Sequence, residues 1–185
     1  MSVIRMTGIA VAVAVALVIA APGTAGNFNF KRQTPNNSTL KWEYACGTGL
    51  CSTQWRSGAG TTTNECQINQ GWLPSGWYSR NAVYHNYDAV IKGRAFWVQD
   101  KQCSNGTWRT ELFIHSEETV SQGQQCTSNP DDPYCWEGTN DYYSNGCIKL
   151  NHATQIGAAH THLHDTTKGG SSSHGSTTMW LTVHN

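Results

Sequence analysis

The stretch Trp108–His115, which reads WRTELFIH, is an alternating run. Successive side chains of a β-strand point to opposite faces, so its even-numbered residues, W, T, L and I, would share one face. The run Leu40–Tyr44 alternates in the same way, and further β-like runs occur at Asn81–Ile91 and Gly93–Gln99. Together they predict a mainly β protein with one or two short helices.

The last third of the chain contains the expected helix. Ile148–Ile156 is predicted as a helix that ends at Gly157. Ala159–His164 and Thr177–Val183 are predicted as closing strands, with a flexible Gly-Ser tract between them at Gly169–Gly175.

Charge is balanced over the 185 residues, with 12 Lys and Arg against 12 Asp and Glu. A balanced chain carries no strong field toward anionic partners, so we expect no nucleic-acid and no membrane-surface binding. Eight tryptophans are expected mainly to fill the core, although some could stack on a wall polymer.

The N-terminus has the pattern of a secretory signal peptide. Arg5 precedes the apolar run Ile9–Ala21, and small residues follow up to Ala25. This predicts a signal peptide over residues 1–25 and a secreted protein. The apolar run is short for a membrane span, so a retained anchor is the alternative. We expect a flexible lead-in at residues 26–38 and one domain at 39–185.

Seven cysteines are an odd number for an exported chain. Neighbours in the sequence suggest the pairs Cys46–Cys51, Cys66–Cys103 and Cys126–Cys135, which would leave Cys147 as a free thiol. The alternative, in which Cys147 joins a bridge and another cysteine is free, stays open because six cysteines allow many pairings.

Cys147 is the candidate nucleophile. If it opened the helix expected after it, the helix dipole would stabilise its thiolate. Backbone N–H groups of Asn145, Gly146 and Cys147 could then face a developing oxyanion. A histidine would take the thiol proton. His115 is the candidate, because Ser116 could hold its ring in one tautomer.

Four segments together resemble the YkuD-type L,D-transpeptidases. Ser144–Leu150, reading SNGCIKL, resembles the Ser/Thr-His-Gly-Cys signature, which often continues Ile-Arg-Leu. Ile114–Ser116 is similar to the segment with the general-base histidine. Leu73–Tyr78 resembles a Thr-Pro-x-Gly-x-Tyr/Phe segment, and Arg56–Gly58 resembles the Ser-Gly stretch that precedes it.

This resemblance implies a β-sandwich catalytic domain that is associated with the cell wall and acts on peptidoglycan stem peptides. We expect a monomer without metal or cofactor. Cys147 would attack a stem-peptide carbonyl and expel the terminal D-alanine, and the acyl group would pass to an amine of another stem or to water. His115 would move the protons and Ser116 would orient it. The residues implied for oxyanion and substrate binding are Ser144, Asn145, Gly146 and Lys149.

The chain departs from the family pattern at three points. Asn145 stands in place of histidine. Lys149 stands in place of arginine, so the positive charge is kept but the planar guanidinium, which can donate two parallel hydrogen bonds, is lost. His115 and Cys147 are 32 positions apart, more than is usual in the family. We interpret residues 117–143 as a disulfide-stapled insertion beside the site. Its aromatic residues could line a substrate channel: Tyr134, Trp136, Tyr142 and Tyr143.

Other functions remain open from the sequence. The same acyl-enzyme would serve an L,D-carboxypeptidase or endopeptidase, and a secreted Trp-rich domain could bind the wall without catalysis. His160, His162 and His164 would share a face of a strand, where they could bind zinc or copper with Asp165 or His174.

Overall fold

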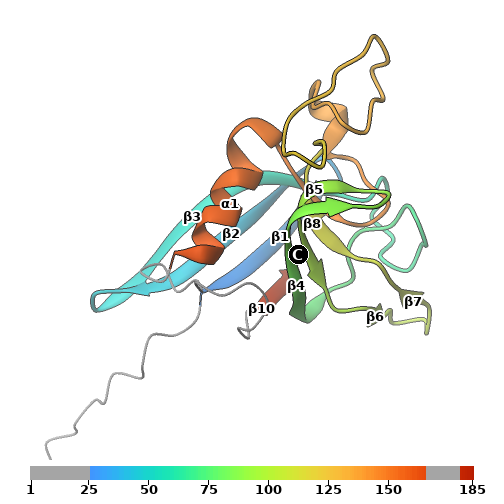
Figure 1. Ribbon diagram of the computed structural model, residues 1–185. Helices are drawn as coiled ribbons and strands as arrows, with labels where there is room; N and C mark the ends of the chain where they lie inside the picture. Colours follow the sequence, from blue (N-terminus) through green and yellow to red (C-terminus); the bar gives the residue numbers. More distant parts are fainter. Residues whose placement is uncertain (1–25, 166–179) are drawn as a thin grey trace, which may run out of the picture.

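The computed structural model describes residues 26–165 and 180–185. The expected signal peptide, the Gly169–Gly175 tract and His174 lie outside these residues. Within them, eight strands close into a barrel in the order β1-β10-β4-β5-β8-β9-β3-β2 (Figure 1). The barrel strands are β1 Asn27–Thr34, β2 Asn37–Cys46, β3 Gly49–Ala59, β4 Gly76–Asp88, β5 Lys92–Val98, β8 Phe113–His115, β9 Ile148–Leu150 and β10 Trp180–His184.

Three short helical segments and one small ribbon complete the described part of the chain. The ribbon pairs β6 Lys101–Gln102 with β7 Trp108–Arg109. The helical segments are the 3-10 helix η1 Thr139–Tyr142, the π-helix η2 His152–Ile156 and the α-helix α1 Gly157–His164. The expectation of a mainly β protein is confirmed, in the form of a barrel.

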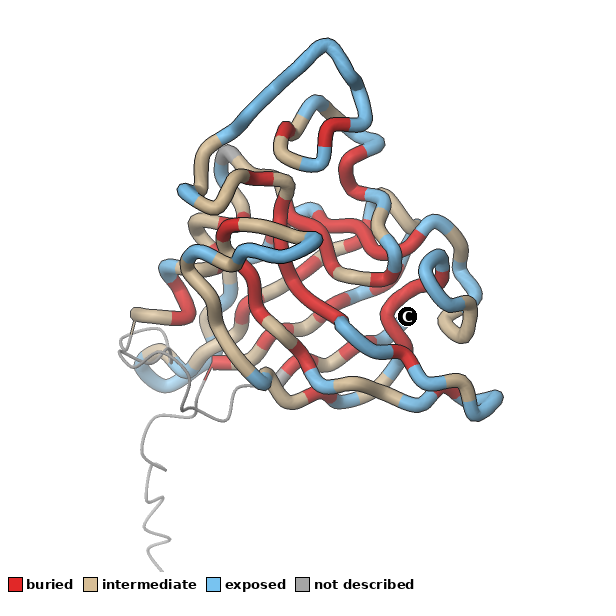
Figure 2. Tube along the Cα trace, turned by 45° about the vertical axis from the view of Figure 1, so that its right-hand side comes forward, coloured by how far each residue is buried: buried red, intermediate tan, exposed pale blue. Residues whose placement is uncertain are grey.

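The core lies inside the barrel, and buried positions lie along its strands (Figure 2). Along β1 and β2 they alternate with less buried positions, so alternate side chains point inward. Leu40 and Trp42 of β2 are fully buried two positions apart. Ala159 and Leu163 of α1 join this core four positions apart, which is the spacing of one helix face. Each large side chain that is fully buried contributes roughly 1.5–3 kcal/mol to the stability of the fold.

The expectation of a flexible lead-in at residues 26–38 is wrong. Residues 27–34 form β1, which pairs antiparallel with β2 and parallel with β10. Phe28 and Phe30 are buried in the core from this strand. The folded domain therefore begins about twelve residues before position 39, and β1 closes the barrel.

The expected helix at Ile148–Ile156 is wrong for its first three residues, although His152–Ile156 does form the π-helix η2. The expected strand at Ala159–His164 is wrong. Ile148–Leu150 is strand β9, because Ile148 and Leu150 are buried two positions apart in the core. The helix α1 follows η2 directly and includes Ala159–His164, so Gly157, expected to end a helix, is the first residue of α1. A Cβ at Gly157 would lie 2.7 Å from Nη1 of Arg94, so the residue allows a close approach there.

The three predicted disulfides, Cys46–Cys51, Cys66–Cys103 and Cys126–Cys135, are all confirmed, and Cys147 is free. Disulfides of this kind fit an oxidising, extracellular environment. Cys126–Cys135 bridges the loop of residues 117–143, whose exposed tip projects from the barrel (Figures 1 and 2). Among the described residues, no helix has the length and apolarity needed to span a membrane.

Candidate functional site

The candidate site forms where two parallel strands meet. β8 and β9 pair in parallel, with Ile114 opposite Ile148 and His115 opposite Lys149. Ile114 and Ile148 point into the core, so His115 and Lys149 point to the other face. Cys147 lies directly before β9, and it lines the same pocket as His115 and Lys149.

A pocket of about 270 Å³ opens over this face. It contains the three expected catalytic residues and all expected binding residues except Gly146, which is buried directly before Cys147. Pro133 and Tyr143 contribute a wall from the loop of residues 117–143. The lining residues are Val90, Ile91, His115, Ser116, Glu117, Pro133, Tyr143, Ser144, Asn145, Cys147 and Lys149.

His115 is buried and held in one orientation. Its Nδ1 lies 2.9 Å from the main-chain oxygen of Ser116. A carbonyl oxygen can only accept, so Nδ1 carries the proton and Nε2 is the basic atom. Burial, and secondarily the charge of Lys149, lower the pKa of His115 to about 3. The ring is therefore neutral at pH 7, and the carbonyl of Ser116 rather than its hydroxyl orients it.

Cys147 is a half-buried, protonated thiol in the resting site. Burial raises its pKa to about 11, and the main chain of Phe113 and the charge of Lys149 partly oppose this rise. The thiol donates to the main-chain oxygen of Glu111 over 3.7 Å. The expected help from a helix N-terminus is absent, because Cys147 is followed by strand β9.

We predict from this pKa that alkylation of Cys147 by iodoacetamide accelerates about tenfold per pH unit between about pH 7 and pH 10. The thiolate is the reactive species, and its fraction grows by that factor below the pKa. An ordinary thiol, with a pKa of about 8.5, would level off within this range. Stopped aliquots analysed by mass spectrometry give the rates.

Cys147→Ser is the control for this experiment, because the other six cysteines are bridged. A rate that is already constant from pH 6 upward would contradict a protonated resting thiol. It would indicate a thiolate–imidazolium pair instead.

Ser144 closes the turn that carries the nucleophile. Its Oγ donates to the Cys147 carbonyl over 2.6 Å and accepts from the N–H groups of Gly146 (3.1 Å) and Gly60 (2.9 Å). The N–H of Gly146, which we expected to face an oxyanion, is thus bonded to Ser144. The main-chain donors left for that role are those of Asn145 and Cys147.

Arg109 supports the same turn, and sequence reasoning missed it. Its buried guanidinium donates to the carbonyls of Trp72 (3.1 Å), Gly71 (3.2 Å) and Asn145 (3.4 Å). Gly146 lies against this guanidinium with φ +114°, a conformation that L side chains rarely adopt. Arg109 therefore fixes the position of Asn145 and Gly146, and through them that of Cys147.

Lys149 supplies positive charge to the pocket while paired with Glu117. Lys149 is buried and Glu117 half-buried, and their side chains form an ion pair. Burial raises the pKa of Glu117 to about 7, although Lys149 opposes this rise. The ammonium group favours the thiolate form of Cys147 and disfavours a second positive charge on His115.

The aromatic residues of the 117–143 loop divide between the pocket and packing. Tyr143 lines the Cys147 pocket. Tyr142 packs against Trp136, with ring centroids 4.7 Å apart, and Lys92 lies over the ring of Tyr134. Of these four aromatic side chains, Tyr143 is the one placed to meet a ligand at Cys147.

Of the two remaining family-like segments, Arg56–Gly58 and Leu73–Tyr78, the first lies beside the candidate site. Ser57 and Gly58 pair with Leu150 and Lys149, so Arg56–Gly58 borders the site. In Leu73–Tyr78, the buried Tyr78 hydroxyl donates to the carbonyl of Pro74 over 2.6 Å, a packing role.

Comparisons with protein-family models, with curated proteins and with solved structures gave no match. The residues of the pocket, their distances and their charges therefore carry the functional inference.

Proposed function

We propose that this protein is a secreted peptidoglycan-modifying cysteine enzyme of the L,D-transpeptidase type. The observation that carries the proposal is that a free thiol, Cys147, and a neutral, oriented imidazole, His115, line one pocket. His115 ends β8, and Cys147 lies directly before β9, the parallel neighbour of β8. A nucleophile beside a base that a third group orients is the arrangement of covalent acyl transfer. The order of the four family-like segments along the chain supports the same class.

In the acylation step, Cys147 Sγ attacks the carbonyl carbon of the diamino-acid residue in a stem tetrapeptide. The thiol proton moves to Nε2 of His115, and the carbonyl oxygen becomes an oxyanion. Collapse of this intermediate breaks the peptide bond, and His115 returns the proton to the departing amine of D-alanine. The product is a Cys147 thioester.

The thioester is resolved by an acceptor. An amine of a second stem attacks the thioester carbon, His115 takes the proton from this amine, and the cysteine leaves as a thiol after receiving it. The result is a 3–3 cross-link. Water in place of the amine gives carboxypeptidase or endopeptidase products. The choice between transfer and hydrolysis depends on which acceptor reaches the thioester past Pro133 and Tyr143, which form one wall of the pocket.

The neutral resting pair means that proton transfer accompanies attack. A thiol with a pKa of about 11 does not ionise ahead of the substrate at pH 7. Lys149 lowers the free energy of the negative charge as it develops. Under this proposal the barrel is this chain's version of the β-sandwich implied by the family resemblance.

The test is acylation by a carbapenem, followed by intact-mass spectrometry of the unreduced protein. L,D-transpeptidases are expected to react with this β-lactam class, so we predict one adduct per chain at Cys147. The adduct should be absent in Cys147→Ala. Defined muropeptides then separate transfer from hydrolysis by the masses of their products.

Iodoacetamide at about pH 9 is the matched probe of thiol access. A chain that is alkylated at Cys147 but takes no carbapenem and turns over no muropeptide would contradict the proposal. If Cys147→Ala also binds peptidoglycan as tightly as the unaltered chain, a non-catalytic wall-binding module becomes the better description.

A further inference from the structure

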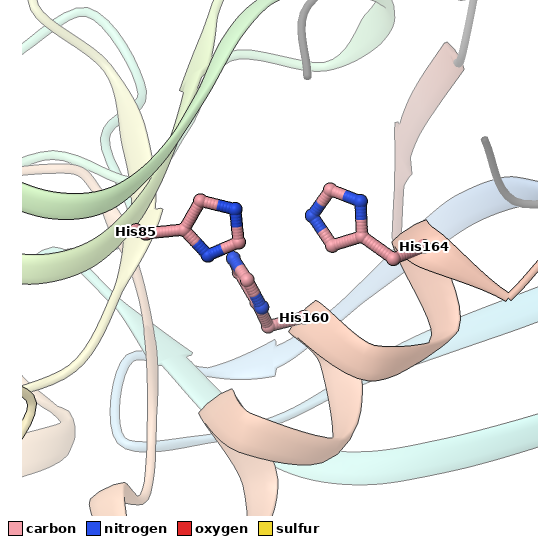
Figure 3. A group of neighbouring side chains, drawn as sticks. All are labelled: His85, His160 and His164. Carbon is pink, nitrogen blue, oxygen red and sulfur yellow. The ribbon is translucent and has the colours of Figure 1, made fainter. Parts of the chain in front are cut away.

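A cluster of three histidines lies away from the Cys147 pocket, between the barrel and its helix. His85 belongs to β4, and His160 and His164 belong to α1. One ring nitrogen of each lies within 4.8 Å of those of the other two, and the three rings point toward one another (Figure 3). Three imidazoles at this separation are a ready ligand set for a transition metal.

The helix explains two of these positions. Residues four apart on an α-helix share a face, so His160 and His164 point the same way. His162 lies on another face and packs against Trp55 of β3, with ring centroids 5.7 Å apart. The expectation that His160, His162 and His164 form one ligand face is therefore wrong, and His85 takes the third position.

A β-bulge explains the position of His85. Between Tyr84 and Tyr87, β4 has one residue more than the opposed stretch of β5. Bulges bend a strand and redirect side chains. Gln122 donates to the main-chain oxygen of His85 over 3.2 Å, which holds the bulge in place.

The rings are packed rather than loosely exposed. The His160 ring stacks against the buried Phe96 at 5.9 Å and meets the His85 ring at 4.3 Å. The His164 ring lies 4.8 Å from that of His160. Each side chain is half-buried, so the barrel and the helix fix the three donors before any ligand arrives.

We propose that His85, His160 and His164 bind one divalent transition metal of the zinc class. Neutral imidazole suits Zn²⁺, Cu²⁺ and Ni²⁺, whereas Mg²⁺ and Ca²⁺ require oxygen ligands. Tetrahedral zinc holds imidazole nitrogens at about 2.0–2.1 Å, and hence about 3.3 Å from one another. Side-chain rotations that draw the nitrogens together by about 1–1.5 Å complete this geometry.

The fourth metal position opens to a cavity of about 590 Å³ over the cluster. Asp165 lines this cavity directly after α1, so its carboxylate or a water molecule can complete the shell. Arg94 also lines it, but its guanidinium is paired with the buried Glu118, with Nη2 and Oε2 2.8 Å apart. That pairing offsets the positive charge next to the cation.

The metal would tie α1 to β4 across the barrel wall. It would stabilise the packing of the helix, because a ligand that binds the folded chain alone shifts the unfolding equilibrium toward the folded state. This site uses none of the Cys147 pocket residues, so it stands independently of the proposed enzymatic activity.

The experiment is a zinc titration of the chain from Gly26 to Asn185, purified without a histidine tag. Isothermal titration calorimetry gives stoichiometry and affinity, and elemental analysis after dialysis confirms the metal content. We expect one Zn²⁺ per chain and no Mg²⁺ binding. His85→Gln and His160→Gln should each weaken zinc binding more than about 100-fold. Mutation of a residue that only hydrogen-bonds to a metal ligand already lowers metal affinity about 10- to 100-fold.

His184→Gln is the matched control, because His184 is an exposed histidine on β10 that does not line this cavity. It should leave the zinc affinity unchanged. Thermal melting without metal checks that each variant folds. Co²⁺ substitution should give tetrahedral absorption bands in the unaltered chain and not in His160→Gln. No stoichiometric zinc, or equal affinity in His85→Gln and His184→Gln, would overturn the proposal.

Discussion

His115→Gln is expected to slow acylation of Cys147 by a carbapenem about 10²- to 10⁴-fold, the range that a general base contributes. The neutral imidazole is the acceptor for the thiol proton, and the thiol does not ionise alone at pH 7 because burial raises its pKa to about 11. Glutamine keeps a polar side chain there but cannot take up a proton. Stopped-flow or timed mass spectra give the rate constants.

A second measurement separates this role from a structural one. In the folded chain the pKa of His115 is about 3, against about 6.5 unfolded. Between these values the unfolded state binds more protons, so this group contributes stability above about pH 6.5 that is lost progressively as the pH falls. At about pH 4.5 the loss is on the order of 2–3 kcal/mol.

His115→Gln should therefore lose less stability than the unaltered chain between about pH 7 and pH 4.5 in urea titrations. The unaltered chain and the variant must be compared with each other, because Glu117 changes the pH dependence of stability in the opposite direction to His115 in both proteins. Its pKa is raised to about 7 on folding, so its contribution grows as the pH falls below 7. Equal acylation rates in both proteins would remove His115 from the mechanism, whatever the stability profiles show.

Local sequence patterns predicted part of this molecule well. The odd cysteine count and the short spacings within Cys46–Cys51 and Cys126–Cys135 identified both the bridges and the free Cys147. The alternation in Leu40–Tyr44 identified part of β2. His115 and Cys147 were expected in one site, and the parallel pairing of β8 with β9 brings them to one pocket.

Long-range contacts determine what local patterns missed. Ile148–Leu150 is too short to show a period, and its place between β8 and β3 makes it a strand. The alternation in Trp108–His115 continues through Glu111, but the structure breaks the strand there at φ +55°. The alternation places Arg109 on the face opposite the even-numbered residues of that run. It gives no sign of the carbonyl partners of Arg109, because these lie far away in the sequence.

The histidine cluster shows the same limit. His160 and His164 could be recognised as a pair once α1 was known, but their spacing fits both periods. His85 enters only because β4 carries a bulge beside the helix. The sequence near His85 does not indicate that it meets His160 and His164, because the bulge and the helix come together only in the folded barrel.

Gly146→Ala is expected to lower the free energy of unfolding by about 3–5 kcal/mol, a loss composed of backbone strain and overpacking. A Cβ at this position would overlap Nη2 of Arg109 and lie 3.1 Å from the Gly71 carbonyl. The guanidinium cannot move aside at low cost, because withdrawing it would leave buried carbonyls unsatisfied. For a chain of this size the melting temperature should fall by about 10 °C.

Gly106→Ala is the matched control, because Gly106 also has positive φ, +89°, but its nearest neighbour to a Cβ is Gln102 Nε2 at 4.0 Å. It introduces the strain without the overlap, so its effect should stay near 1–2 kcal/mol, or about 2–6 °C. Thermal unfolding followed by circular dichroism measures both. If the two variants have the same melting temperature, the Arg109 side chain moves aside for the methyl group and does not fix the turn. A larger fall for Gly146→Ala, with faster alkylation of Cys147 at pH 7, would show that the buried guanidinium holds the nucleophile in place.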